Sequence, residues 1–255
     1  MHSTLNARFV ERLKQREPLL GTILSLPSPE VAELMAAAGF DWLFVDLEHG
    51  LLEFSSAQRL LQAAAGCPCL VRVPSGSAID VARALDIGAA GIIVPHVDTA
   101  AQAAAAVRAA KYPPEGTRSI GAARAQGYGL RTTEAVKAGN AGTAVVAQVE
   151  HVDGVRAIGE IVAVPGVDAV FIGPFDLSAS LGKPGAIDAG DVQDAVATVL
   201  AACRRAGKPC GIFLVHAAAA RQAFDAGHSF VCLATDTLIL GNAASELVRR
   251  ARPRP

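Results

Sequence analysis

The sequence lacks any apolar run long enough to cross a bilayer, because charged residues recur through its alanine-rich segments. Its first residues are polar and charged, without the apolar core of a signal peptide. It also lacks an excess of charge, since 23 lysine and arginine residues stand against 24 aspartate and glutamate residues. A balance of this kind argues against a surface for nucleic acid or membrane, so we expect neither partner. These absences predict a soluble, cytoplasmic protein.

The cysteines do not show the number or spacing of a disulfide framework or a metal site. The five residues are odd in number, and Cys67-Pro68-Cys69 has neither the zinc nor the thioredoxin spacing. We therefore expect reduced, packed thiols, as in other cytoplasmic proteins.

What the chain does contain is a regular alternation of apolar strand patterns and amphipathic helix patterns. After an opening helix with apolar residues at 5, 9 and 13, strands are predicted at 19–24, 42–46, 70–73, 91–94, 144–149, 169–172, 211–214 and 230–233. The predicted helices cover 28–39, 55–65, 78–86, 99–110, 152–161, 192–206, 217–226 and 240–250. Eight such units in 255 residues predict one α/β domain over residues 1–255, a TIM (β/α)₈ barrel preceded by a helix.

A doubly wound open sheet is the competing fold. It would place a glycine-rich phosphate loop after the first strand, where Leu24-Ser25-Leu26-Pro27 stands instead. Two segments, 111–143 and 177–191, are longer than ordinary connections and are rich in glycine, proline and charge. Segments of that kind usually line a site or an interface.

Carboxylates follow two neighbouring strands of the predicted barrel. Asp176 comes just after the strand at 169–172, and Glu150 ends the preceding strand with Gln148 on the same face. Active sites of TIM barrels lie at this end of the strands. Two carboxylates meeting there would repel unless a proton or a divalent cation lay between them, and oxygen ligands suit Mg²⁺ or Mn²⁺. Both a metal site and a proton-sharing pair remain open.

Other strand ends contribute a histidine and an arginine. Asp46 and Glu48 share one face of the chain, and either carboxylate could orient the imidazole of His49 as a general acid or base. Arg72 ends an apolar strand, so its guanidinium must be paired or must bind an anionic ligand. A salt bridge to Glu48 or Asp46 is the structural alternative.

Lysine is scarce, with five residues at 14, 111, 137, 183 and 208. None of them ends a predicted strand, and only Lys183 lies on a loop at that end of the barrel. A lysine-imine mechanism is therefore disfavoured, and a metal must supply the electrophile.

Taken in order along nearly the whole chain, the motifs resemble the HpcH/HpaI family of metal-dependent (class II) pyruvate aldolases, the 4-hydroxy-2-oxoheptanedioate and 2-dehydro-3-deoxyglucarate type. The matching stretches are Ala38-Gly39-Phe40-Asp41-Trp42, Asp46-x-Glu48-His49-Gly50, Val71-Arg72-Val73-Pro74, Gly88-Ala89-x-Gly91-Ile92-Ile93-Val94-Pro95, Tyr112-Pro113-Pro114-Glu115-Gly116-x-Arg118, Gln148-Val149-Glu150 and Gly173-Pro174-x-Asp176-Leu177-Ser178.

The resemblance implies an enzyme, a carbon–carbon lyase that reversibly cleaves a 4-hydroxy-2-oxo acid to pyruvate and an aldehyde through a metal-stabilised enolate. It implies that Glu150 and Asp176 bind Mg²⁺, Mn²⁺ or Co²⁺ and that Arg72 steadies the enolate. Backbone amides at Phe175 and Asp176 would hold the substrate carboxylate. Gln148 would support the site, and His49, oriented by Asp46, would move the 4-hydroxyl proton. A homohexamer, a trimer of dimers that exchange their last helices, is also implied.

Two related enzymes are alternatives on the same site: a CoA-ester lyase of the citrate lyase β type and an oxaloacetate decarboxylase. A non-enzymatic interaction module would lack Arg72, Glu150 or Asp176, and all three are present. The sequence leaves open the aldehyde and the roles of His96, His216 and segment 111–143. Ile23 stands where several family members carry tryptophan, which reshapes the acceptor pocket.

Overall fold

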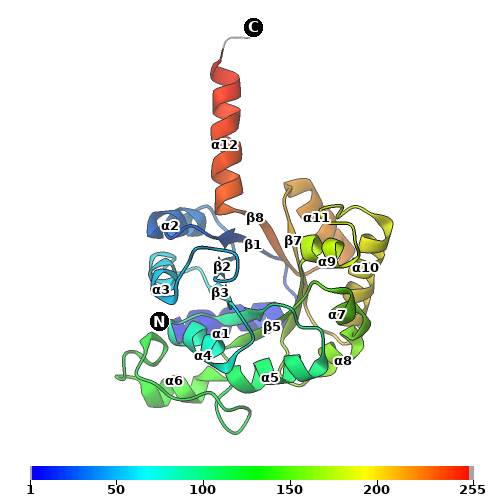
Figure 1. The fold of residues 1–255 in the computed structure, drawn as a ribbon. Helices are drawn as coiled ribbons and strands as arrows, with labels where there is room; N and C mark the ends of the chain where they lie inside the picture. Colours follow the sequence, from blue (N-terminus) through cyan, green and yellow to red (C-terminus); the bar gives the residue numbers. More distant parts are fainter. Residues whose placement is uncertain (1, 253–255) are drawn as a thin grey trace.

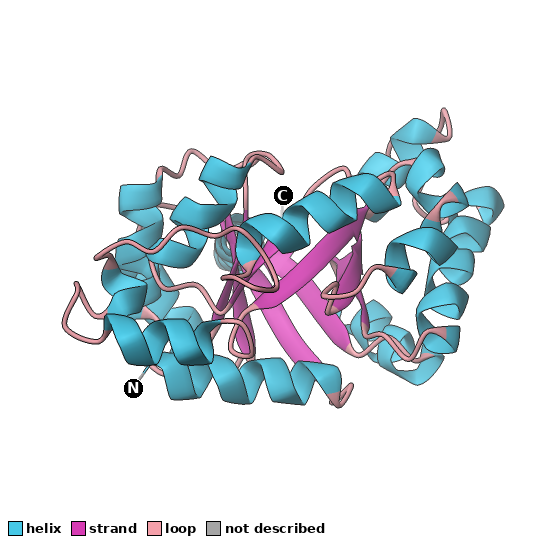
Figure 2. Cartoon of the chain, turned by 90° about the horizontal axis from the view of Figure 1, so that it is seen from below, coloured by secondary structure: helices cyan, strands magenta, loops and turns pink. Residues whose placement is uncertain are grey.

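The computed structural model describes residues 2–252, and within them eight parallel strands close into a barrel in sequence order (Figures 1 and 2). The strands are β1 Leu19–Leu24, β2 Trp42–Asp46, β3 Cys69–Arg72, β4 Gly91–Val94, β5 Ala144–Val149, β6 Ala169–Ile172, β7 Cys210–Leu214 and β8 Phe230–Thr235. Most of their residues are buried, as expected of strands covered on both faces. The predicted TIM barrel is confirmed.

Helices surround the strands in Figure 2. They are α1 His2–Lys14, α2 Pro29–Ala37, α3 Phe54–Ala63, α4 Ala78–Asp86, α5 Ala100–Ala110, α6 Thr132–Gly139, α7 Val152–Arg156, α8 Ile158–Ala163, α9 Pro174–Ser180, α10 Gly190–Arg205, α11 Ala217–Ala226 and α12 Asp236–Ala251, with a 3₁₀ turn, η1, at Arg124–Gln126. Helix α1 belongs to the interior core, since its Phe9, Val10 and Leu13 pack in the same cluster as Trp42.

The barrel interior is filled by aromatic rings. Trp42, Phe44, Phe171 and Phe230 form a chain of contacts with ring centroids 5.6–6.1 Å apart. Gly21 is required beside them, because a Cβ there would lie 2.4 Å from the Trp42 ring. The filled interior makes the barrel a packed core, and Phe44 and Phe171 of that core also line a cavity.

Two predicted element boundaries are wrong. No helix was expected between the strand at 169–172 and residue 192, yet α9 begins directly after β6, because Pro174 occupies its first turn and needs no hydrogen-bond acceptor there. The helix expected over 152–161 is divided at Ala157 into α7 and α8, with a glycine of low helix propensity in each half. The long connection at 111–143 contains η1 and α6.

The last helix lies away from the barrel. We expected residues 240–250 to be buried against another subunit as well as against their own barrel, and α12 projects from its own barrel (Figure 1). Asp236 alone in this helix is buried, and its carboxylate accepts hydrogen bonds from the backbone of Ser25 and Leu26. The helix is thus held only at its first turn, and its apolar residues stay exposed, among them Leu238, Leu240, Leu247 and Val248. None of the helices described in residues 2–252 has the length and apolarity to cross a membrane.

Candidate active site

A cavity of about 270 Å³ opens at the carboxyl ends of the strands. Six of the seven predicted site residues line it: Asp46, His49, Arg72, Gln148, Phe175 and Asp176. The seventh, Glu150, is buried beside Gly173, where a Cβ would come within 2.9 Å of its Oε2. Gly173 therefore lets the backbone after β6 approach the Glu150 carboxylate. The structure brings the residues predicted from four separate segments to one end of the barrel.

Arg72 is the centre of a buried ion-pair network. Asp46 and Arg72 are opposite one another in the register of β2 and β3, so their side chains share a face. The Arg72 Nε and Nη2 donate to the two Asp46 oxygens at 2.9 and 2.6 Å, and Nη1 lies 3.1 Å from Glu48 Oε2. Burial alone would raise the pKa of Asp46, but the Arg72 hydrogen bonds and charge outweigh it, so that pKa lies below its ordinary value.

His49 lies at the exposed edge of this network, with its side chain 63% accessible. Its Nε2 is 3.8 Å from Glu48 Oε2, whereas Asp46 contacts His49 through the backbone, accepting its N–H at 3.3 Å. The carboxylate that faces the imidazole is thus Glu48, and the Asp46 carboxylate is occupied by Arg72 and the loop backbone. An exposed imidazole at the rim can exchange protons with a substrate or with water.

Glu150 is held from two sides. Its Oε2 accepts a hydrogen bond from Gln148 Nε2, and its Oε1 accepts the backbone N–H of His96 at 2.8 Å. Gln148 and Glu150 therefore do share a face, as the period-two pattern predicted. The fixed carboxylate is 2% exposed and points toward the other acidic groups of the site.

His96 is a site residue to which sequence reasoning assigned no role. It follows β4, and its Nδ1 lies 3.5 Å from Glu150 Oε1 while its Nε2 lies 3.5 Å from Glu48 Oε1. One potential ligand atom from each of Glu48, His96 and Glu150 falls within 4.8 Å of the others. The available signal was the position of His96 directly after a barrel strand, in Val94-Pro95-His96.

Asp176 stands apart from that group. It lies in the first turn of α9, is exposed, and makes no ion pair or hydrogen bond with another side chain in the part of the chain that is described. The helix N-terminus favours its negative charge. Because it lines the cavity, its carboxylate is available to a ligand.

The donor set suits a hard divalent cation. The buried Gln148 Oε1 accepts no hydrogen bond from any residue within 2–252, and Glu48 Oε2 is partnered there by the Arg72 ion pair at 3.1 Å. Burial raises the pKa of Glu48, Arg72 lowers it, and the nearby Glu150 raises it further, with a net upward shift. Since Arg72 is shared between Asp46 and Glu48, a cation beside Glu48 and Glu150 would relieve the repulsion between these two carboxylates.

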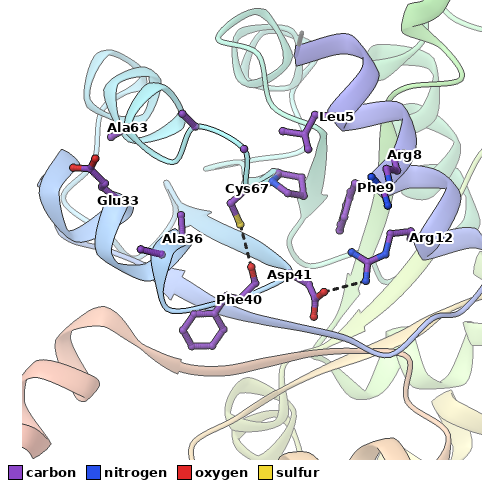
Figure 3. Close-up of a pocket in the computed structure, with 14 residues that line it drawn as sticks. Leu5, Arg8, Phe9, Arg12, Glu33, Ala36, Phe40, Asp41, Ala63 and Cys67 are labelled. Carbon is purple, nitrogen blue, oxygen red and sulfur yellow. Dashed lines mark hydrogen bonds and ion pairs between the residues drawn. The ribbon is translucent and has the colours of Figure 1, made fainter.

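A larger cavity, about 630 Å³, lies among α1, α2 and the end of α3 (Figure 3). Its Arg12 is already paired with Asp41 at 3.0 Å, and its Cys67 thiol donates to the Phe40 carbonyl. Burial raises the pKa of Cys67 to about 12, so the thiol is not a nucleophile near neutral pH. Its lining residues offer no group poised for catalysis.

Comparison with known proteins agrees with this geometry. The model of the family described as HpcH/HpaI aldolase/citrate lyase matches residues 20–243. The chain belongs to this family. The predicted family resemblance is therefore confirmed, and with it an enzyme of the carbon–carbon lyase class.

Relatives of this HpcH/HpaI protein cover almost all of its length. It is 40% identical to a hydroxypyruvate/pyruvate aldolase of Paraburkholderia phytofirmans, over 98% of this chain and 99% of the relative. It is 36% identical to a 4-hydroxy-2-oxovalerate aldolase of Novosphingobium aromaticivorans, over 100% and 97%. An HpcH/HpaI aldolase/citrate lyase family protein from Burkholderia cenocepacia superposes with a TM-score of 0.93 at 39% identity, covering 96% of this chain and 99% of that one.

Proposed function

We propose that this HpcH/HpaI protein is a divalent-metal-dependent aldolase that reversibly cleaves a 4-hydroxy-2-oxo acid to pyruvate and an aldehyde. The observation that carries the proposal is the Arg72 guanidinium, held by Asp46 and Glu48, at one cavity with His49 and Asp176, with the buried Glu150 carboxylate beside the Gly173 that lines it. The names of the relatives, pyruvate and 4-hydroxy-2-oxo acid aldolases, support the same reaction class.

Each polar group has a role in this reaction. Arg72 faces the 2-oxo oxygen, where negative charge develops, and Asp46 fixes the direction of the guanidinium. Gln148 holds Glu150 in place through its hydrogen bond. Glu150 and Asp176 hold the cation, Mg²⁺, Mn²⁺ or Co²⁺, which when bound supplies Lewis acidity toward the 2-oxo group. The backbone amides at Phe175 and Asp176 receive the substrate carboxylate.

We assign the transfer of the 4-hydroxyl proton to His49. The imidazole lies at the rim of the cavity, with Glu48 as the nearest carboxylate. In the cleavage direction it accepts the hydroxyl proton, directly or through water, while the C3–C4 bond breaks; in synthesis it returns that proton.

The aldehyde part of the substrate would contact apolar side chains of the cavity. Ile23, Phe175 and Phe213 line the cavity, and the rings of Phe175 and Phe213 have centroids 6.2 Å apart. The cavity therefore favours a small aldehyde that places an uncharged surface against these three side chains.

Exhaustive chelation is expected to abolish pyruvate release from 4-hydroxy-2-oxo acids, and added Mg²⁺, Mn²⁺ or Co²⁺ to restore it, because no lysine in the cavity lining can form an imine. Pyruvate release from a panel of such acids, before and after metal is returned, is the measurement. Full turnover in the chelated enzyme, or borohydride trapping of the substrate on a lysine, would contradict the proposal. Oxaloacetate and a citrate-type CoA ester belong in the panel, since a decarboxylase or CoA-ester lyase would prefer them.

The proposed assembly is a homohexamer, a trimer of dimers in which α12 is exchanged. It is supported by the exposed apolar residues of α12, which projects away from its own barrel. Leu240→Arg is expected to weaken the assembly by roughly tenfold or more, as loss of a buried apolar contact does at interfaces. Ser245→Arg, on the same helix, is the control for added charge. Sedimentation equilibrium of the three proteins is the measurement, and a wild-type monomer at micromolar concentration would refute the assembly.

A further inference from the structure

The side of the cavity that faces Arg72 and Glu150 is formed by three neighbouring strands. In the closed barrel, β7, β8 and β1 lie across from β3, β4 and β5. Phe213 of β7, Thr235 of β8 and Ile23 of β1 line the cavity from that side, and Ile23 is opposite Thr235 in the register of β1 and β8. Since Arg72 and Glu150 are assigned to the 2-oxo end of the substrate, its aldehyde end lies toward β7, β8 and β1.

Ser25 adds a hydroxyl to this largely apolar side. It comes directly after β1, two residues beyond Ile23, and lines the same cavity. Its carbonyl oxygen lies 3.5 Å from the position that a Cβ on Gly50 would take, and Gly50 is the residue after His49. Ser25 is therefore next to the loop that carries the residue assigned to the 4-hydroxyl proton. The region that Ser25 lines is the one into which the carbon beyond C4 extends.

The buried carboxylate of Asp236 fixes the direction of the Ser25 hydroxyl. Each of its oxygens accepts two hydrogen bonds. Ser25 Oγ and Thr237 N donate to Oδ1 at 2.7 and 2.8 Å, and the backbone N–H groups of Ser25 and Leu26 donate to Oδ2, both at 2.9 Å. A carboxylate that accepts four hydrogen bonds has no proton to give, so the Ser25 hydroxyl must donate its own proton to Asp236. Toward the cavity the Ser25 oxygen can therefore act only as an acceptor.

The other hydroxyl of this side is already occupied. Thr235 Oγ1 accepts the backbone N–H of Leu238 at 3.1 Å, as the cap of α12, and lies 2.8 Å from Thr237 Oγ1. Within residues 2–252, no group donates a hydrogen bond to Ser25 Oγ. Ser25 is thus the hydroxyl with unused acceptor capacity at the aldehyde end of the cavity.

We propose that Ser25 determines the acceptor specificity of this enzyme by accepting a hydrogen bond from a hydroxyl on the carbon next to the aldehyde group. The preferred acceptors are then short, uncharged α-hydroxyaldehydes. An aldehyde without that hydroxyl leaves the serine oxygen unpaired beside Ile23, which disfavours it. Asp236 is the positioning residue, since it holds the serine proton away from the cavity. The inference rests on the proposed aldolase function and names the substrate class of the same site.

Two substrates that differ by one hydroxyl test the proposal: 4,5-dihydroxy-2-oxopentanoate, which releases glycolaldehyde, and 4-hydroxy-2-oxopentanoate, which releases acetaldehyde. The ratio of their kcat/KM values is expected to fall by about 3–10-fold in Ser25→Ala, the range of one hydrogen bond between neutral groups. Ser28→Ala is the matched control, because Ser28 caps α2 in the same connection and lies outside the cavity lining, and it should leave the ratio unchanged. Equal losses for both substrates in Ser25→Ala would show that Ser25 only supports the structure, and would overturn the proposal.

Ser25→Cys provides the second variant, since its thiol keeps a donor for Asp236 but its sulfur is a weak acceptor. It should lower the ratio even if Ser25→Ala fails to fold, and a wild-type ratio in Ser25→Cys would contradict the proposal. Synthesis from hydroxypyruvate and acetaldehyde places the hydroxyl on the other reactant, and a selective loss there would also overturn it. A wild type that cleaves neither acid would refute the proposed function and this inference together. Cleavage of both acids with an unchanged ratio in the Ser25 variants would refute this inference alone.

Discussion

Replacement of His49 by alanine is expected to slow aldol cleavage by ~10²–10⁴-fold, the usual contribution of general acid–base catalysis. Oxaloacetate decarboxylation requires the same negative charge on the 2-oxo oxygen but has no 4-hydroxyl proton to move. Decarboxylation should therefore be much less affected in His49→Ala. Steady-state rates of both reactions, measured on one preparation of enzyme, report the two steps separately.

The control for His49→Ala is His216→Ala, which removes an imidazole from another strand end and should leave both rates near the wild-type values. If His49→Ala impairs decarboxylation as severely as cleavage, His49 maintains the structure of the site and its assignment to the 4-hydroxyl is wrong. Glu48→Gln should reduce cleavage less than His49→Ala if Glu48 only orients the imidazole at 3.8 Å.

Replacement of Arg72 by alanine is expected to reduce cleavage and decarboxylation together, by about 10²–10³-fold, as when one donor to a developing oxyanion is removed. Arg72→Lys keeps the positive charge but not the planar fork that contacts Asp46 and Glu48. It should restore part of both rates in equal proportion. Loss of only one reaction in Arg72→Ala would show that the guanidinium does not face the oxygen common to both.

Loss of activity in Arg72→Ala has to be separated from loss of stability. Removing Arg72 leaves Asp46 buried without its partner, which typically costs about 3–5 kcal/mol in the free energy of unfolding. In the wild type the folded-state pKa of Asp46 lies below its ordinary value, so the pair stabilises the fold at neutral pH. That contribution disappears as the pH falls below about 4 and Asp46 takes up a proton. Denaturant unfolding at pH 7 and pH 3 should therefore show the largest difference between the two proteins at pH 7.

The candidate active site shows where prediction from strand ends succeeds and where it stops. Asp46 and Arg72 could be placed together because each ends an apolar strand, and strands adjacent in sequence are adjacent in the barrel. Gln148 and Glu150 could be placed on one face by the two-residue period. His96 could not be placed in this way, because its direction depends on a backbone turn with positive φ that no periodic pattern encodes.

The sequence by itself determined the barrel, the order of its strands and the strand ends that carry the chemistry, since apolar periodicity and strand length are local properties of the chain. Tertiary structure alone decided which groups meet. Asp46 binds Arg72 and leaves Glu48 as the carboxylate facing His49, and the Glu150 carboxylate accepts the His96 backbone. It also decided that α12 leaves the barrel after its first turn, anchored by Asp236. Contacts between loops, and the direction of a terminal helix, depend on residues distant in sequence whose mutual geometry exists only once the barrel has closed.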